Sequence, residues 1–488
     1  MVKVKTLALS VGAALAWGTL GSAHAATTTQ QVADLKAQVA ELQQMVQQLS
    51  SQQQSQAVQL QQTAEIAAAK PAPVVAPVAA STKPGWFTLP DGQTQVKLYG
   101  SVRVDATYDT KANPTSSIYN NTNSVPLNSA NGTKNNLNVT AATSRIGLDI
   151  VRPTEYGDLV GKIEADFAGN ATNSSYINGN GTFRVRHAYF SLGKWLVGQT
   201  TSPFVNTDTA PETVDFNGPM GYGSQRNVQV RYTQPITANQ KLLLALEGGD
   251  VDNINSSSNT YTATTTTGSF GATGITTNSG GNRLPALTAR YDIATADKKG
   301  LLQVHGLVHE NRVSVATASN NTGTNIDETK LGWGVGVGGK YSFTPNDTVF
   351  ANYYHVKGDN KYLLYTNPAY VAAINGTSLK DTTDVSIYES EYDTGLLGYS
   401  HKWSPQWRST VAAGAIWYKN DNDYAAKAPN LNKKLYNIIV NSFYSPVKNV
   451  DLGVEYTYGQ RETFASKTPI TDNQGDYSRV NLMAKYNF

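Results

Sequence analysis

The chain has 488 residues, a formal net charge of +3 and no cysteine. These values exclude a disulfide framework and thiol chemistry, and the small charge gives no reason to expect a nucleic-acid partner. Mean hydropathy is negative, and beyond the N-terminus no stretch approaches the ~20 apolar residues of a membrane helix. The 27 tyrosines and 41 glycines instead favour a membrane β-barrel, in which every second strand residue faces lipid and tyrosine rings lie at the two interfaces.

The first 25 residues have the pattern of a secretory signal peptide. Lys3 and Lys5 precede an apolar run over residues 7–20, and Ala23-His24-Ala25 has the small-x-small form of a cleavage site. We therefore expect residues 1–25 to be removed on export.

Residues 26–66 carry a heptad repeat. Apolar residues recur at spacings of three and four: Val32, Leu35, Val39, Leu42, Val46 and Leu49. This spacing predicts a coiled-coil helix, and valine at a with leucine at d favours two strands in isolation. The alternative is a glutamine-rich disordered tail. Residues 67–94 are rich in alanine and proline and predict an extended, semi-rigid linker.

From residue 95 onward, apolar and polar residues alternate in short segments separated by turn signals. Period-two alternation predicts strands with one apolar and one polar face. Sixteen are predicted, at 95–108, 143–151, 159–169, 183–191, 195–200, 226–233, 240–248, 283–291, 300–310, 330–340, 347–357, 388–400, 407–418, 434–444, 450–459 and 477–488. Their connections alternate between short turns and eight long loops rich in Asn, Thr, Ser and Gly, as an antiparallel transmembrane barrel requires.

The polar face of these strands carries many charges. They are Lys97, Arg103, Asp105, Arg145, Asp149, Lys162, Glu164, Asp166, Arg184, Arg186, Arg231, Glu247, Arg479 and Lys485. So many ions cannot fill a dry core, but they can line water while the apolar face meets lipid. We take Lys97, Arg103, Arg145, Lys162, Arg184, Arg186 and Arg231 as candidate basic pore-lining residues. The alternative for each is an ion pair along the wall.

The long loop 201–225 differs from the others because it is less rich in Asn and Thr. It carries the apolar residues Phe204, Val214, Phe216 and Met220 and the acidic residues Asp208, Glu212 and Asp215. The apolar residues predict a loop packed against something, either the barrel interior or its own surface. Inside the barrel, the three carboxylates would face Arg103, Arg145, Arg184 and Arg186 and set up a transverse field. Glycines at 332, 334, 336 and 338 share the polar face of one strand and leave room for such a loop.

Several segments together resemble the DcaP-like porins of Gram-negative bacteria. They are 97–105 (KLYGSVRVD), 144–147 (SRIG), 156–159 (YGDL), 163–167 (IEADF), 184–189 (RVRHAY), 195–200 (WLVGQT) and 212–216 (ETVDF). The resemblance implies an all-β, sixteen-stranded antiparallel transmembrane β-barrel in the outer membrane, a periplasmic coiled-coil helix and a homotrimer. It also implies a preference for small anionic solutes such as dicarboxylates, and porins commonly fold their third long loop into the lumen. The mixed lumen charge leaves the ion preference open.

The function expected from these features is passive diffusion of small hydrophilic solutes through a water-filled pore, with no catalytic residue and no cofactor. One alternative is an outer-membrane barrel enzyme, a lipase or protease; another is an envelope tether anchored by the barrel. His305 and His309 cannot jointly bind one metal ion, because a separation of four residues along a strand spans about 13 Å.

Overall fold

The structure is a computed structural model of the chain. It describes residues 84–112, 119–128, 130, 133–169, 182–248, 260–263, 275–279, 283–317, 326–374, 385–465 and 471–488, together with Gln44 and Gln47, which are helical. The chain divides into two compact units, residues 1–77 and 78–488. The predicted signal peptide, the coiled coil apart from those two glutamines, and the linker up to residue 83 lie outside the described residues.

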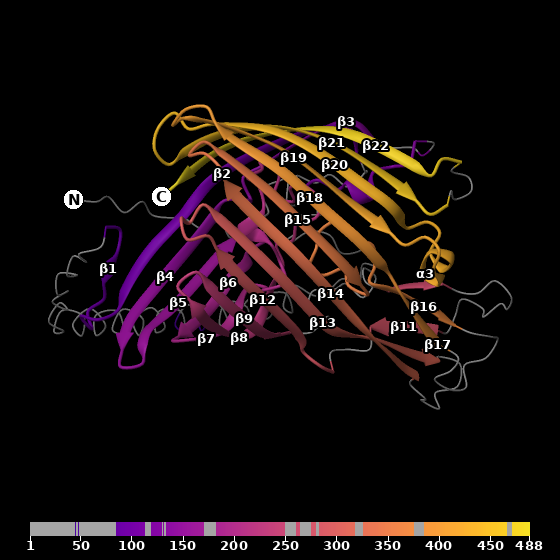
Figure 1. Cartoon of the computed structure of the whole chain (residues 1–488), viewed down its shortest axis with the longest axis horizontal. Helices are drawn as coiled ribbons and strands as arrows, with labels where there is room; N and C mark the ends of the chain where they lie inside the picture. Colours follow the sequence, from indigo (N-terminus) through magenta and orange to yellow (C-terminus); the bar gives the residue numbers. More distant parts are fainter. Residues whose placement is uncertain are drawn as a thin grey trace, which may run out of the picture. The chain divides into compact units, whose positions relative to one another are not determined.

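Sixteen of the described strands form a closed antiparallel ring (Figure 1). In ring order they are β2 (Gln95–Ala112), β4 (Arg145–Thr154), β5 (Gly157–Asp166), β6 (Arg184–Leu192), β7 (Trp195–Thr201), β8 (Arg226–Thr237), β9 (Gln240–Glu247), β12 (Ala286–Ala294), β13 (Gly300–Thr317), β14 (Ile326–Ser342), β15 (Asp347–Lys357), β18 (Glu391–Lys402), β19 (Trp407–Tyr418), β20 (Asn432–Tyr444), β21 (Val450–Thr463) and β22 (Gln474–Asn487). The predicted class, strand number and approximate strand positions are confirmed.

The ring closes where the last strand pairs with the first. β22 pairs with β2 in antiparallel register, with Tyr486 opposite Val102, and β2 also pairs with β4. At the junction, Gly100 and Phe488 exchange both backbone hydrogen bonds, each at 3.1 Å. Closure leaves none of the sixteen ring strands as an unpaired edge, as a lipid environment requires.

The two faces of the sheet differ as the alternation predicts. In β22, Leu482 is 51% exposed, whereas its neighbour Asn481 and the nearby Arg479 are each only 3% exposed. The same contrast runs around the ring: large apolar side chains are exposed on the outside, and polar side chains are buried inside. The apolar exterior is therefore the lipid-facing surface, and the interior is polar.

Shorter elements supplement the ring. β1 (Phe87–Thr88), β3 (Thr133–Thr140) and β11 (Ile275–Ser279) extend the same sheet, whereas β10 (Thr260–Ala263), β16 (Tyr370–Ile374) and β17 (Val385–Glu389) form a separate three-stranded sheet. Two 3₁₀ turns, η1 (Thr122–Ser124) and η2 (Thr207–Thr209), and the short helix α3 (Asp423–Lys427) complete the described elements. Except for β1, which lies in the predicted linker, and the last two residues of β17, which fall in the predicted strand 388–400, all of these occur in segments predicted as loops.

Figure 1 shows α3, β16 and β17 together at one end of the strands, where long connections leave β15 and β19. Within the part of the chain that the structure describes, no helix has the length and apolar character needed to cross a membrane.

Candidate functional site

Loop 201–225, here called the constriction loop, lies inside the barrel. It leaves β7 and returns to β8, yet its polar contacts reach far around the ring. Asn352 of β15 donates from Nδ2 to the Thr209 carbonyl at 2.9 Å. Further along, Glu455 of β21 accepts from the Val214 backbone N–H at 2.7 Å. The loop therefore crosses the interior and follows the wall opposite its own roots.

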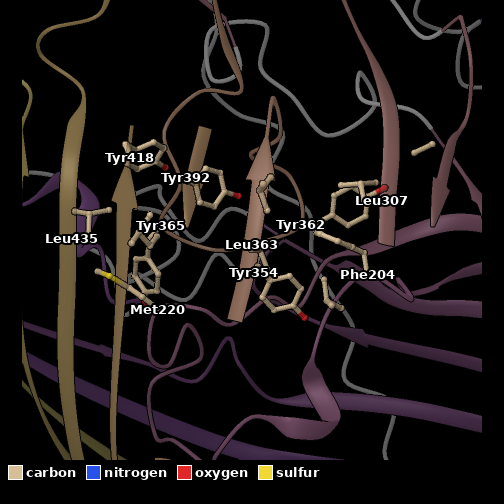
Figure 2. Close-up of a cluster of buried hydrophobic side chains, with 14 residues drawn as sticks. Phe204, Met220, Leu307, Tyr354, Tyr362, Leu363, Tyr365, Tyr392, Tyr418 and Leu435 are labelled. Atoms are coloured by element: carbon tan, nitrogen blue, oxygen red, sulfur yellow. The ribbon is translucent and has the colours of Figure 1, made fainter. Parts of the chain in front are cut away.

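Apolar anchors hold the loop against that wall. Phe204 and Met220 are fully buried, and Val214 is almost so. The Phe204 ring lies edge-on between Tyr354 of β15 and Tyr362, with centroid distances of 5.4 and 5.5 Å. Figure 2 shows Phe204, Tyr354 and Tyr362 in the same buried cluster as Met220. Burial of this size, about 2 kcal/mol for each large side chain, stabilises the inward position of the loop.

The glycines of β14 make room for the loop, as the sequence predicted. A Cβ on Gly334 would lie 2.7 Å from Cζ of Phe204, and a Cβ on Gly338 would lie 2.8 Å from Oγ1 of Thr209. Such distances are too short for a real side chain. The bare backbone of β14 is therefore part of the seat of the constriction loop.

The acidic residues of the constriction loop have partners other than those predicted. Asp208 faces Arg290 of β12 at 3.4 Å, Glu212 faces Arg408 of β19 at 2.7 Å, and Asp215 faces Arg479 of β22 at 3.2 Å. The prediction had placed them opposite Arg103, Arg145, Arg184 and Arg186. The correction has a geometric cause: the loop runs along the β12–β22 wall, so the cations of that wall are nearest.

A cluster of four arginines lies on the other wall. It consists of Arg145, Arg184, Arg186 and Arg226, here called the arginine cluster. Arg184 pairs with Asp166 at 2.7 Å, and Arg186 pairs with both Glu164 and Asp166 at 2.9 and 2.8 Å. Arg145 lies 3.3 Å from Glu164.

Arg226, at the root of the constriction loop, also belongs to this cluster, and the sequence did not predict it. It lies close enough to Arg145, Arg184 and Arg186 to be repelled by them. Its Nε has no hydrogen-bond partner among the described residues. The cluster thus sets four positive charges against the two carboxylates of Glu164 and Asp166. The only sequence signal for Arg226 was its place as the first residue of the predicted strand 226–233, which also carries the inward arginine at 231.

The remaining predicted basic residues lie on strands of the barrel. Arg103 of β2 bridges to the constriction loop: its Nη2 donates to the Val214 carbonyl at 2.6 Å, and its guanidinium lies 4.1 Å over the Phe216 ring. Lys162 pairs with Asp149 at 2.6 Å.

Lys97 and Arg231 complete that set. Lys97 of β2 is directly opposite Asp149 of β4 in the register of the sheet. Arg231 of β8 is opposite Leu196, and its Nε finds no hydrogen-bond acceptor in the described part of the chain. Arg103 therefore contacts the constriction loop directly, while Lys97, Lys162 and Arg231 belong to the wall.

Two further long loops also fold inward, and the sequence pattern did not predict this. Residues 358–369 follow β15 and bury Tyr362, Leu363 and Tyr365. Residues 119–128 reach the tip of the constriction loop, where the Asn217 side chain donates to the Asn120 carbonyl at 2.9 Å. The available signal was the Tyr-Leu-Leu-Tyr run at 362–365, which is unusually apolar for an exposed loop.

Burial also affects Tyr365, the second tyrosine of this run. It raises the pKa of Tyr365 well above its ordinary value of 10, so the hydroxyl remains protonated and donates to the Gly218 carbonyl at 2.6 Å.

The interior histidines act as wall residues. His305 Nδ1 lies 2.9 Å from the Pro203 carbonyl, and His309 Nε2 lies 3.3 Å from Asp359. In the described ranges, no group of three or more His, Cys, Asp or Glu side chains has the geometry to hold a metal ion.

The family model described as DcaP outer membrane protein matches residues 19–273 and 269–488. The crystal structure of the outer membrane channel DcaP of Acinetobacter baumannii is 33% identical, covering 82% of this chain and 98% of that one with a TM-score of 0.64.

More distant likenesses include two other outer-membrane proteins. OmpT of Vibrio cholerae is 13% identical, covering 81% of this chain and 98% of its own with a TM-score of 0.47. The anion-selective porin from Comamonas acidovorans is 12% identical, covering 81% and 100% with a TM-score of 0.48. No match was found among curated proteins.

Proposed function

We propose that this chain, which belongs to the DcaP outer membrane protein family, lets small hydrophilic solutes diffuse passively across the outer membrane. The observation that carries the proposal is a closed sixteen-stranded barrel with an apolar exterior and a charged interior, crossed by a loop fixed to one wall. A barrel of this size is wide enough for an aqueous channel. Charged side chains around a water-filled path then select among solutes.

Anionic solutes, among them small dicarboxylates, are the preferred class in this proposal. The arginine cluster holds four positive charges against two carboxylates, while the acidic residues of the constriction loop are each paired with a wall arginine. The arginine cluster therefore carries uncompensated positive charge, which attracts anions and repels cations. On the loop side each wall arginine also pairs with a second carboxylate, Asp292, Asp451 or Asp109, so the positive excess belongs to the cluster alone. Lys97, Arg103, Arg145, Lys162, Arg184, Arg186 and Arg231 form the basic wall of the path. Asp208 and Glu212 form its acidic side, and the buried Asp215 ties the constriction loop to Arg479.

Reversal potentials in a salt gradient across planar bilayers test this proposal. We expect stable ohmic steps with anion preference for the wild type and reduced anion preference for the double variant Arg184→Ala/Arg186→Ala, which leaves Glu164 and Asp166 without those partners. Arg152→Ala is the control, because this exposed arginine sits at the end of β4 near a short turn, 3.5 Å from Asp91.

Three outcomes would count against the proposal. An unchanged reversal potential in the double variant would place these arginines away from the ion path. Hydrolysis of lipid or peptide without conductance would favour the barrel enzyme, and a protein that only anchors the envelope would give no conductance steps at all.

The proposal extends to targeting and assembly. Residues 1–25 direct export and are removed, residues 26–66 form a periplasmic coiled coil, and three copies assemble as a homotrimer embedded in outer-membrane lipid. Deletion of residues 26–66 should leave conductance intact and lower the fraction of trimer after chemical cross-linking. If conductance were lost from inserted barrels, the coil would belong to the permeation path.

A further inference from the structure

The long loop between β15 and β16 does not project away from the barrel. Every residue from Gly358 to Tyr370 is buried or partly buried, although the segment contains no strand before Tyr370. Exposed loops at a barrel rim normally keep much of their surface in water. Some packing must therefore hold this segment, and its partners identify where it lies.

One end of the segment contacts β9. Tyr362 donates its hydroxyl to the Glu247 carboxylate at 3.0 Å, and the Lys361 ammonium donates to the Gly248 carbonyl at 3.2 Å. Glu247 is the last residue of β9 and is almost completely buried.

The other end contacts β19 and β20. The Asn367 backbone N–H donates to the Tyr418 hydroxyl at 2.6 Å, and the Asn367 side chain donates to the Asn432 carbonyl at 2.6 Å. From β9 to β20 the ring passes through β12, β13, β14, β15, β18 and β19, so the two anchored strands stand seven positions apart in a ring of sixteen. A segment tied to walls so nearly opposite must cross the opening.

Between these ends the segment rests on the constriction loop. Tyr365 donates its hydroxyl to the Gly218 carbonyl at 2.6 Å, and the Leu364 backbone N–H donates to the Tyr222 carbonyl at 3.1 Å. Figure 2 shows Tyr362, Leu363 and Tyr365 in one buried cluster with Phe204 and Met220 of the constriction loop.

The backbone at Tyr365 supports a fixed rather than a passing contact. Its φ is +68°, a left-handed conformation that costs a bulky residue of the order of 1 kcal/mol or more. Such strain persists only where the surroundings hold the residue in place. Here the buried ring and the hydrogen bond to Gly218 supply that hold.

We propose that residues 358–369, here called the crossing segment, form a second constriction element that spans the barrel mouth. The segment also holds the part of the constriction loop that leads back to β8, through Gly218 and Tyr222. The inference rests on the proposed pore function and adds to it a determinant of solute size. Solutes entering from the long-loop side pass the crossing segment before they reach the arginine cluster. The segment sets the largest solute that enters, while the arginines set which sign of charge is preferred.

The first test removes the anchors of the segment. The variant Tyr362→Ser/Leu363→Ser/Tyr365→Gly loses the buried side chains, and glycine tolerates the left-handed conformation at 365. Single-channel conductance and the exclusion limit for neutral poly(ethylene glycol) of graded size are measured in planar bilayers. We expect a larger exclusion limit and a conductance rise of about twofold, because permeation follows pore cross-section, with the reversal potential unchanged.

The second test separates release of the segment from misfolding. Gly223→Ala adds only a methyl group, but its Cβ would lie 2.4 Å from the Tyr362 carbonyl oxygen. The variant therefore pushes the crossing segment away without changing any of the segment's own side chains. Gly306→Ala is the matched control, since the nearest atom to its Cβ is 4.0 Å away. We expect Gly223→Ala to raise the exclusion limit and Gly306→Ala to match the wild type.

The outcomes separate this inference from the proposed function. A wild-type protein without conductance contradicts the pore itself. A conducting wild type with folded variants, judged by heat-modifiable migration on gels, whose conductance and exclusion limit equal or fall below those of the wild type would overturn the crossing segment as a constriction.

Discussion

Phe204 rests its ring on the bare backbone of Gly334, so closely that a Cβ on Gly334 would lie 2.7 Å from the ring carbon Cζ. The root of the constriction loop and the glycines of β14 are thus complementary surfaces. Gly334→Ala should destabilise the barrel by about 1–3 kcal/mol, the usual cost of overpacking a tight site, or displace the loop root. Urea unfolding in lipid vesicles and single-channel conductance measure the two effects.

The matched control lies in the same strand on the opposite face. Gly339→Ala points outward, and its Cβ would meet nothing closer than the Leu301 carbonyl at 3.5 Å. It should unfold and conduct as the wild type does. Equal behaviour of both variants would mean that β14 does not seat the loop.

Glu455 holds the tip of the constriction loop through hydrogen bonds to its carboxyl oxygens. Its carboxylate accepts from the backbone N–H groups of Val214 and Asp215 at 2.7 and 3.0 Å and from the Asn441 side chain at 3.0 Å. Glu455→Gln keeps the shape but replaces one acceptor oxygen with an amide NH2 group, a donor that would face other donors. A buried polar group left without its partner costs about 1–3 kcal/mol. We expect lower resistance to urea and more current noise in the open channel.

Glu462→Gln serves as the comparison for this change. Glu462 lies on the same strand but pairs with the partly exposed Lys433 at 3.1 Å, an interaction worth less than about 1 kcal/mol. Its noise and stability should match the wild type. If Glu455→Gln were as quiet and as stable, the loop tip would be held by its apolar contacts alone.

The barrel was predictable because its rule is local. Alternation fixes which side chains share a face, as with Leu482 outside and Asn481 inside, and the long and short connections count the strands. Strand edges were less certain where pairing continues beyond the membrane: β13 runs to Thr317 and β14 begins at Ile326, several residues past the predicted ends. There the two strands support each other, and no lipid boundary marks the end.

The site was predictable only in part, because side-chain partners depend on the path of a loop. The apolar residues of the constriction loop indicated that it packs inward, and Phe204 does so. The sequence does not indicate in which direction the constriction loop runs around the ring. The prediction therefore assigns Asp208 to the wrong wall, and the structure shows it facing Arg290. Arg226 was missed because it lies five positions before the inward Arg231 on the same strand, so the period-two alternation assigns it to the opposite face.

Arg103 joins the barrel wall to the constriction loop in a way that lysine cannot reproduce. Its guanidinium donates to Asp105 from both Nε and Nη2, donates to the Val214 carbonyl and covers the Phe216 ring. Arg103→Lys keeps the charge but loses the planar fork. We expect a reversal potential close to that of the wild type, together with increased open-channel noise.

Arg152→Lys provides the control for this substitution, since the exposed Arg152 makes one ion pair, with Asp91 at 3.5 Å. It should leave both quantities unchanged. A shift of reversal potential in Arg103→Lys without added noise would show that Arg103 acts on permeating ions and does not position the loop.

The seam between β2 and β22 depends on Gly100 and the terminal Phe488. The two residues exchange backbone hydrogen bonds at 3.1 Å, and a Cβ on Gly100 would lie 2.4 Å from the Arg145 carbonyl and 2.7 Å from the Phe488 ring. Gly100→Ala must therefore open the seam or displace the ring, and closure is what removes unpaired edges from lipid. We expect less heat-modifiable, folded protein in outer-membrane fractions. Gly395→Ala, whose Cβ would be 3.7 Å from its nearest neighbour, should fold normally, and equal yields for the two variants would show that the seam tolerates the added methyl group.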